Sequence, residues 1–416
     1  MGPRSRIPGR ASFFPLEEFR MFKNAYIPYG GYYSSPFCKW MGSLANLNSI
    51  ELGAATSKRW FASRDIDPAI IDYLYLGVSV GQKSIFYGAP WAAAMMGAGQ
   101  APGQNITQAC ATATTAVFNA ALAVESGSFD TTYCLLADRP SNGPHTIWPN
   151  PAGPGGEVIA ENWNMDNIAA DPVTGKDMLT TAENVAREHG FTREQADELT
   201  LRRYAQYAEA LADDRAFQKR YMFPLEVAVS RKETKLVEAD EGVTATSAEG
   251  LAKLRTVQPD GIHTYGAQTH PADANAGIVV TTRERAQAMS RDPQMAVQVL
   301  AYGHARTKPA HMPMAPATAA QRALDQAGLT IAQIKTVKNH SPFIANDLHL
   351  AKALGIDAHD FNNYGTSLVY GHPQAPTLAR LLIEAIEETA IKGGGYALVT
   401  GCAAGDSAAA LVVKVG

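Results

Sequence analysis

Two cysteines and two histidines stand in sequence settings where a thiol and an imidazole can do chemistry. Cys110 precedes a run of small, helix-forming residues that begins at Ala111. A thiol at a helix N-terminus meets backbone N–H groups and the positive end of the helix dipole, and both favour a nucleophilic thiolate. Taken alone, the position is better explained as a buried structural cysteine, because most cysteines are buried and inert.

The two histidines follow different signals. His372 lies in Gly371-His372-Pro373, a turn before an expected helix, and a histidine there can take the proton of a thiol. A loop histidine that hydrogen-bonds with the backbone explains it about equally well. His340 follows an expected strand, and the carboxyl ends of strands in open α/β sheets are where ligands bind. Capping of the strand end is the equal alternative.

Cys402 follows the expected strand at 396–400 and has glycine and alanine as neighbours, which leaves room for a ligand to approach its sulfur. A cysteine in a tight turn is the simpler alternative. Cys38 and Cys134 have no such context, so we expect them to be structural. No two of the four cysteines have the close spacing of a zinc ligand pair, so we expect no metal in this chain.

The elements that must position these groups alternate between strands and helices, which predicts an α/β protein. Buried strands are predicted at 73–78 and 133–137, and a second pair with similar spacing at 334–338 and 396–400. This similarity indicates an internal duplication of a βα-rich half. The alternative is two unrelated βα stretches.

Between the two halves lies a different kind of sequence. Prolines and glycines crowd the segment 141–176 and predict a loop, and Thr192 with Gln195 forms a capping box that predicts a helix over 192–212. Apolar spacing predicts further helices at 48–63, 316–328 and 376–391. The predicted domains are an N-terminal half, an inserted loop domain, return strands that complete the N-terminal half, and a C-terminal half, over 1–140, 141–262, 263–303 and 304–416.

Composition sets the protein class. The 416 residues include 46% hydrophobic residues, 36 Lys plus Arg and 40 Asp plus Glu, for a net charge of −4. This is typical of a globular chain and argues against a nucleic-acid or anionic-membrane partner. No apolar run reaches the length that spans a bilayer, and no secretory signal is evident. We therefore expect a cytoplasmic protein.

Together these residues resemble the thiolase family, in which a nucleophilic cysteine, a polar oxyanion residue, a Gly-His-Pro histidine and a second cysteine occur in this order. The resemblance covers nearly the whole chain, with further matches at Gly42–Ala45, Ile66–Ala69, Thr181–Val185, Val237–Glu241, Leu251–Arg255 and Asn275–Gly277. It implies the thiolase fold, with two duplicated halves in a five-layer αβαβα arrangement and an inserted loop domain. It also implies coenzyme A as a substrate, no covalently bound cofactor and a dimer of thiolase chains.

The resemblance assigns Cys110 as the nucleophile, His372 as its base and Cys402 as the second acid and base. His340 stands where the family usually has the asparagine of Asn-Glu-Ala-Phe, as in a subgroup with histidine there. Asn339 is the rival if the register slips by one residue. The resemblance further implies a second oxyanion hole, formed by the backbone N–H groups of Cys110 and Gly405. It also implies that Arg231 faces the adenine of CoA and that Met178 lies beside the acyl pocket.

Departures from the family pattern affect the expected pocket shape, since Ala375–Leu378 replaces the usual Gly-Ala-Ser-Gly. Thiolases with such departures often resemble chains that act together with a small zinc-ribbon/OB-fold partner subunit, so the resemblance implies a candidate partner of that type. The narrower resemblance is to the thiolase subunits that cleave benzoylsuccinyl-CoA in anaerobic toluene degradation. Two alternatives stay open: a decarboxylating condensing enzyme of the ketoacyl-synthase type, which would not need Cys402, and a non-catalytic acyl-CoA-binding subunit.

Overall fold

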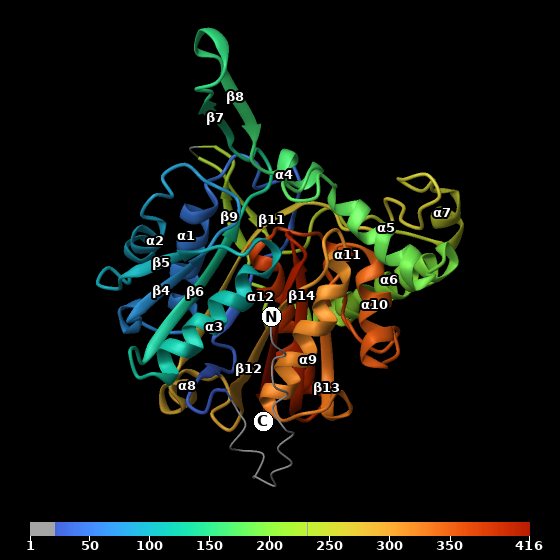
Figure 1. Cartoon of the computed structure of the whole chain (residues 1–416). Helices are drawn as coiled ribbons and strands as arrows, with labels where there is room; N and C mark the ends of the chain where they lie inside the picture. The colour runs from blue at the N-terminus through green and yellow to red at the C-terminus, as the bar shows by residue number, and fades with distance from the viewer. Residues whose placement is uncertain (1–20, 231) are drawn as a thin grey trace, which may run out of the picture.

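The computed structural model describes residues 21–230 and 232–416, so Arg231 lies outside the described residues. Their architecture is built on one 11-stranded sheet (Figure 1). Along the sheet the order is β13 (Ile334–His340), β14 (Gly395–Ala403), β15 (Ser407–Val415), β12 (Ala296–Arg306), β1 (Tyr26–Pro28), β11 (Ala272–Thr281), β6 (Thr131–Asp138), β4 (Tyr73–Gly77) and β5 (Gly103–Ile106). The short strands β2 (Tyr32–Ser34) and β3 (Cys38–Lys39) also pair with β11.

The two ends of this sheet repeat one pattern. β4 pairs in parallel with β6, which pairs antiparallel with β11. In the same way β13 pairs in parallel with β14, which pairs antiparallel with β15. All four predicted strands are present, and their pairing follows the expected duplication. Because the sheet is continuous through β1, the domain boundaries given above stay a prediction.

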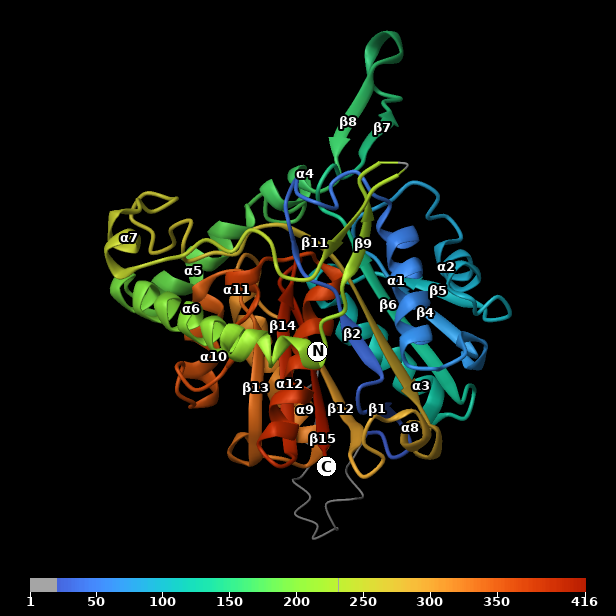
Figure 2. The same cartoon turned by 180° about the vertical axis from the view of Figure 1, so that it is seen from behind.

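Helices divide the structure into five layers (Figures 1 and 2). α3 (Thr112–Glu125) and α12 (Ala375–Ile391) pack on each other between the two halves of the sheet. α1 (Ser49–Ser63) and α2 (Gly88–Met96) cover the outer face of one half, and α9 (Ala315–Ala327) and α10 (Ile344–Leu354) cover that of the other. Strand residues alternate between inner and outer cores: in β4, Tyr75 faces α3 while Leu74 and Leu76 face α1 and α2.

The segment between the halves is more structured than its composition predicts. The expected loop over 141–176 contains the hairpin of β7 (His145–Pro149) and β8 (Val158–Asn162), which projects from the body of the molecule, and then α4 (Met165–Ala169). The prolines and glycines from Pro151 to Gly156 form the connection between the two strands. Prediction failed here because exposed apolar residues such as Trp148 and Ile159 hide the strand alternation.

The remaining helices fit the predicted caps closely. α6 (Arg193–Arg215) begins after Thr192, whose capping box with Gln195 is present, although its last turn is irregular from Ala212 onward. α9 ends at Gly328, which has a left-handed φ of 66°.

The other elements are α5 (Met178–His189), α7 (Ala248–Lys253), α8 (Arg283–Met289), α11 (Ser367–Tyr370), β9 (Leu225–Ala228) and β10 (Thr234–Val237). No helix among the described residues has the length and hydrophobicity needed to cross a membrane.

Candidate active site

The fold brings three of the four predicted reactive groups to one point. Cys110 lies in the turn between β5 and α3, His340 is the last residue of β13, and His372 follows α11. One ligand atom from each lies within 4.8 Å of the other two. The structure therefore joins a thiol from one half of the molecule with two imidazoles from the other half.

Cys110 and His372 form a directly hydrogen-bonded pair. The Sγ of Cys110 lies 3.0 Å from Nε2 of His372, and the hydroxyl of Thr377 lies 2.7 Å from Nδ1 of the same ring. A nucleophile beside a base that a third group orients is the arrangement needed to activate a thiol. Gly371 is required before the histidine, because its φ is 96° and an added Cβ would lie 2.7 Å from the His270 ring.

Burial keeps this pair neutral at rest. It raises the pKa of the Cys110 thiol to about 12 and lowers the pKa of the His372 imidazole to about 3. The position of Cys110 at a helix N-terminus predicts a readily formed thiolate, whereas the buried thiol stays protonated. The reason is that desolvation outweighs the effect of the nearby N–H groups. The hydrogen bonds that lower the pKa of Cys110 come from its own backbone and from that of Ala404.

Among the described residues, the backbone of Ala404 is close enough to the Cys110 sulfur to lower the pKa of the thiol, and Gly405 is not among the causes of that shift. Gly405 instead uses its carbonyl, which accepts from the Arg306 guanidinium at 3.2 Å. In the sequence, the signal for Ala404 is its position two residues after Cys402. The family usually has the glycine of Cys-x-Gly there, and this chain has Cys402-Ala-Ala.

His340 presents an unused imidazole nitrogen to the site. Its Nδ1 lies 2.6 Å from the Ser367 hydroxyl, which also accepts from the backbone N–H of Ser341. The Ser367 hydroxyl can then donate its hydrogen bond to an unprotonated Nδ1. In that tautomer the ring proton is on Nε2, which becomes the N–H donor. Nε2 is buried without a partner among the described residues, and the ring centroid lies 4.2 Å from that of His372. Burial, and secondarily His372, lowers the pKa of His340, so the ring is neutral.

Asn339, the rival of His340, points elsewhere. Its side-chain amide donates to Asp347 at 2.7 Å, because neighbouring residues of a strand face opposite sides. Asp347 is also paired with the buried guanidinium of Arg203 at 2.8 Å. The geometry therefore favours His340 as the residue that reaches Cys110.

Cys402 has a very different environment. Its side chain is fully buried in β14 and packs with Met178, Met312 and Phe343. The Sγ accepts a hydrogen bond from the Asn346 amide at 3.2 Å. Burial raises the pKa of this thiol, and the neighbouring Cys110 raises it further. Sequence reasoning missed Asn346, whose only signal is its place six residues after His340, in the first turn of α10.

Two of the reactive groups, Cys110 and His372, open onto a cavity of about 580 Å³, a volume in the range of small-molecule sites. Cys110, His372 and Met178 line it. Polar side chains in the lining include Glu161, Gln268 and Gln374. The large apolar side chains in the lining include Trp40, Trp148, Trp163, Met165, Met312 and Phe343.

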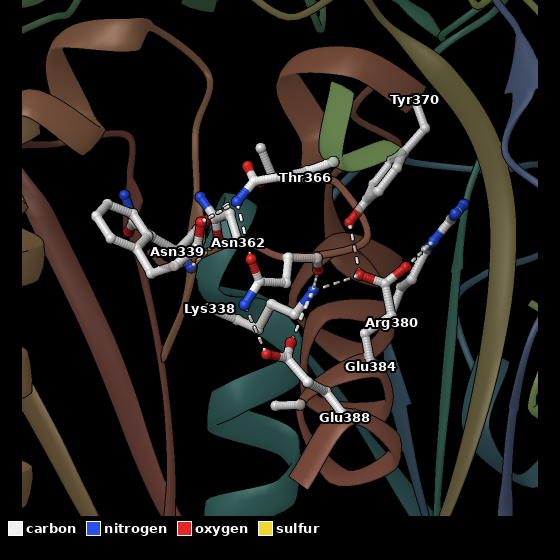
Figure 3. A network of polar contacts seen from close by, with 12 residues as sticks. Lys338, Asn339, Asn362, Thr366, Tyr370, Arg380, Glu384 and Glu388 are labelled. Carbon is white, nitrogen blue, oxygen red and sulfur yellow. Dashed lines mark hydrogen bonds and ion pairs between the residues drawn. The ribbon is translucent and has the colours of Figure 1, made fainter. Parts of the chain in front are cut away.

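A buried polar network lies behind the site and fixes the segments that carry the imidazoles (Figure 3). Lys338, two residues before His340, reaches Glu384 of α12 at 3.4 Å. The backbone of Asn339 accepts from the Thr366 hydroxyl at 2.8 Å and donates to the Asn362 side chain at 2.7 Å. These bonds tie β13 both to the helix after His372 and to the loop before Ser367.

Comparison with known proteins places the chain in a family. The model of the thiolase N-terminal domain matches residues 31–284, and that of the thiolase C-terminal domain matches residues 293–415. The chain therefore belongs to the thiolase family of acyltransferases. One relative is a probable acetyl-CoA acetyltransferase of Mycobacterium leprae, 28% identical over 385 residues that cover 91% of this chain and 97% of that protein. Another is a 3-ketoacyl-CoA thiolase of Aliivibrio fischeri, 28% identical over 428 residues that cover 92% of this chain and 93% of that protein.

Solved structures agree on the thiolase fold. The acetyl-CoA acetyltransferase of Bacillus anthracis superimposes with a TM-score of 0.87 at 23% identity, and covers 95% of this chain and 99% of its own. Human mitochondrial 3-ketoacyl-CoA thiolase in complex with CoA has a TM-score of 0.85 at 22% identity, with 96% and 98% covered. The five layers and the repeated strand pattern are thus those of the family.

Proposed function

We propose that the protein cleaves a 3-oxoacyl-CoA thiolytically through an acyl-cysteine intermediate. The observation that carries this proposal is the hydrogen-bonded pair of Cys110 and His372 at a cavity, 3.0 Å apart, with a second cysteine close behind. In the first step His372 takes the thiol proton and the sulfur attacks the 3-keto carbon. The bond between C2 and C3 then breaks, and its electron pair goes to the departing enolate thioester.

Cys402 is the proposed proton donor to that enolate, which leaves as an acyl-CoA. The thiol of coenzyme A then attacks the acyl group on Cys110 while Cys402 takes up its proton. The Cys110 sulfur departs as the leaving group and regains the proton held by His372. Each proton that leaves a thiol is thereby returned, and the protein needs no metal or redox step for this sequence.

Two sets of donors support the negative oxygens in this sequence. The unpartnered Nε2 of His340 is the proposed donor to the enolate oxygen, together with a water. The backbone N–H groups of Cys110 and Gly405 are the proposed donors to the tetrahedral intermediate, and the backbone of Ala404, which lowers the pKa of the Cys110 thiol, is a further candidate. Arg231, expected to face the CoA adenine, keeps that proposed role from the resemblance alone.

For the substrate we propose benzoylsuccinyl-CoA, which would give benzoyl-CoA and succinyl-CoA. The narrower resemblance suggests it, and tryptophan, methionine and phenylalanine side chains in the cavity wall support an aromatic acyl group. A thiolase-chain dimer with a small zinc-ribbon/OB-fold partner, in the cytoplasm, remains part of this proposal.

The test is to incubate the protein with benzoyl-CoA, acetyl-CoA and longer acyl-CoAs and to find the acylated residue by mass spectrometry. We expect a benzoyl adduct on Cys110 that free CoA removes, and formation of benzoyl-CoA from benzoylsuccinyl-CoA. The assay is run alone and with the candidate partner subunit. Adducts from acetyl-CoA only would overturn the aromatic substrate, and no adduct on Cys110 from any acyl-CoA would overturn the thiolase mechanism.

One arrangement favours a second candidate, decarboxylating condensation. Two neutral imidazoles beside one cysteine, His340 and His372, are what a ketoacyl-synthase-type site needs. Release of CO₂ from malonyl-CoA, measured beside thiolysis, distinguishes the two. Fast decarboxylation that survives Cys402→Ala would support the synthase, whereas thiolysis that depends on Cys402 supports the thiolase.

A further inference from the structure

Gln374 brings a carboxamide to the nucleophile, and none of the steps above uses it. Its Oε1 lies 3.3 Å from the Sγ of Cys110. The same side chain raises the pKa of the His372 ring against the larger opposing effect of burial. Gln374 also lines the cavity. One amide therefore contacts the nucleophile and also acts on its base.

The local backbone is arranged so that this side chain faces the sulfur. Gln374 is the N-cap residue of α12 and has a φ of 62° and a ψ of −108°, a strained conformation that glycine would adopt more readily. N-cap side chains usually bond to their own helix, but that of Gln374 does not. Asp138 of β6 instead accepts from the N–H of Ala375 at 2.9 Å. The helix end is thus satisfied from elsewhere, and the Gln374 amide is left for Cys110.

A carboxamide can bond to a sulfur in both protonation states. Its oxygen accepts from the S–H of a thiol, and after a half-turn its NH₂ group donates to a thiolate. Burial opposes ionisation of Cys110, so a donor at this place has a large effect on how much thiolate forms. The side chain of an apolar residue would offer the thiolate nothing.

The geometry points to Gln374 as a further catalytic residue, whose amide stabilises the Cys110 thiolate while His372 holds the proton. Its part in turnover rests on the proposed function. The stabilisation of the thiolate does not, because it is measurable without any acyl-CoA.

The experiment measures the rate of Cys110 alkylation by iodoacetamide at several pH values, with mass spectrometry to locate the label. Gln374→Met keeps the length of the side chain and removes both hydrogen-bonding groups. Loss of a hydrogen bond to a charged group raises the pKa of Cys110 by about one to two units. Because a more basic thiolate is also more nucleophilic, the rate at a fixed pH falls by only about 3- to 15-fold. Gln374→Glu, which accepts but cannot donate, is expected to be slower still.

Two further variants make the result decisive. Gln374→Gly relieves the strained backbone, so it folds even if the methionine variant does not, and it must also slow alkylation. Gln268→Met is the matched control, since Gln268 lines the same cavity but makes no hydrogen bond to Cys110 among the described contacts; its alkylation profile is expected to follow that of the wild type. Thermal unfolding is measured for every variant.

Alkylation of Gln374→Met and Gln374→Gly at rates within twofold of the wild type would overturn the inference. The proposed function fails by a different observation, namely a wild-type protein whose Cys110 accepts no acyl group. In that case the alkylation rates still decide whether Gln374 stabilises the thiolate.

Discussion

The two cysteines of the site carry the same functional group in opposite surroundings. Cys110 is partly exposed to the cavity and has His372 and Gln374 within hydrogen-bonding distance. Cys402 is fully buried among apolar side chains, and the amide of Asn346 is the one side chain that hydrogen-bonds with it among the described residues.

This difference suggests how the two thiols divide the work. A sulfur that must bond to a substrate carbon needs open space and a base in contact with it, and only Cys110 has both. A sulfur that only passes a proton must reach the substrate carbon but needs no base in contact with it. Burial raises the pKa of Cys402, so this thiol holds its proton until a strongly basic enolate forms beside it. Each variant below either removes or sharpens this contrast.

Cys110→Ala should have the largest effect, because it removes the group that forms the covalent bond. We expect thiolysis to fall by at least on the order of 10⁴-fold. Mass spectrometry after incubation with acyl-CoA should find no acyl adduct on the protein. An acyl group trapped on Cys402 of this variant would show that the buried sulfur is also a nucleophile, and the contrast would be lost.

Cys402→Ala should separate proton transfer from acylation. Loss of a general acid costs on the order of 10²–10⁴-fold, and we expect this loss in cleavage of the 3-oxoacyl-CoA. Labelling of Cys110 by acyl-CoA followed in a single turnover is expected to be less affected. Equal losses in both measurements would contradict the role of Cys402 as the proton donor to the enolate.

His340→Ala should remove one donor to the enolate oxygen and slow cleavage by on the order of 10²–10³-fold. His340→Asn restores the residue that the family usually has there and should recover part of the rate. The steady-state kcat of both variants is the measurement. An unchanged rate in the alanine variant would move the role to Asn339, although its side chain faces Asp347.

The sequence was sufficient to predict the parts of the fold that depend on local patterns. The strands that became β4, β6 and β14 contain runs of apolar residues, the strand at 334–338 was expected from the repeated order of elements, and α6 follows a capping box. The hairpin of β7 and β8 was missed, since its strands expose large apolar side chains and so lack the alternation that marks a half-buried strand.

The site could be predicted only in part. Local sequence context singled out the cysteines and histidines, and family resemblance assigned their roles. The structure brings Cys110, His340 and His372 together. Asn346, Ala404 and Gln374 were not predicted, because their importance comes from contacts between distant segments. Tertiary burial also explains why Cys110 stays protonated. The helix terminus is a local feature that favours the thiolate, but desolvation by the whole fold has the larger effect and raises the pKa of the thiol.

The smallest expected effect concerns the resting state of Cys110. Burial raises the pKa of this thiol to about 12, so the thiolate fraction grows about tenfold for each pH unit throughout the range below that value. Alkylation by iodoacetamide should therefore rise steadily with pH up to about pH 9 and show no inflection. A preformed pair of thiolate and imidazolium would instead give a plateau between about pH 5 and 8. The burial of Cys402 predicts that it stays unlabelled over the same range, and early labelling of it would show that the two sulfurs are equally accessible.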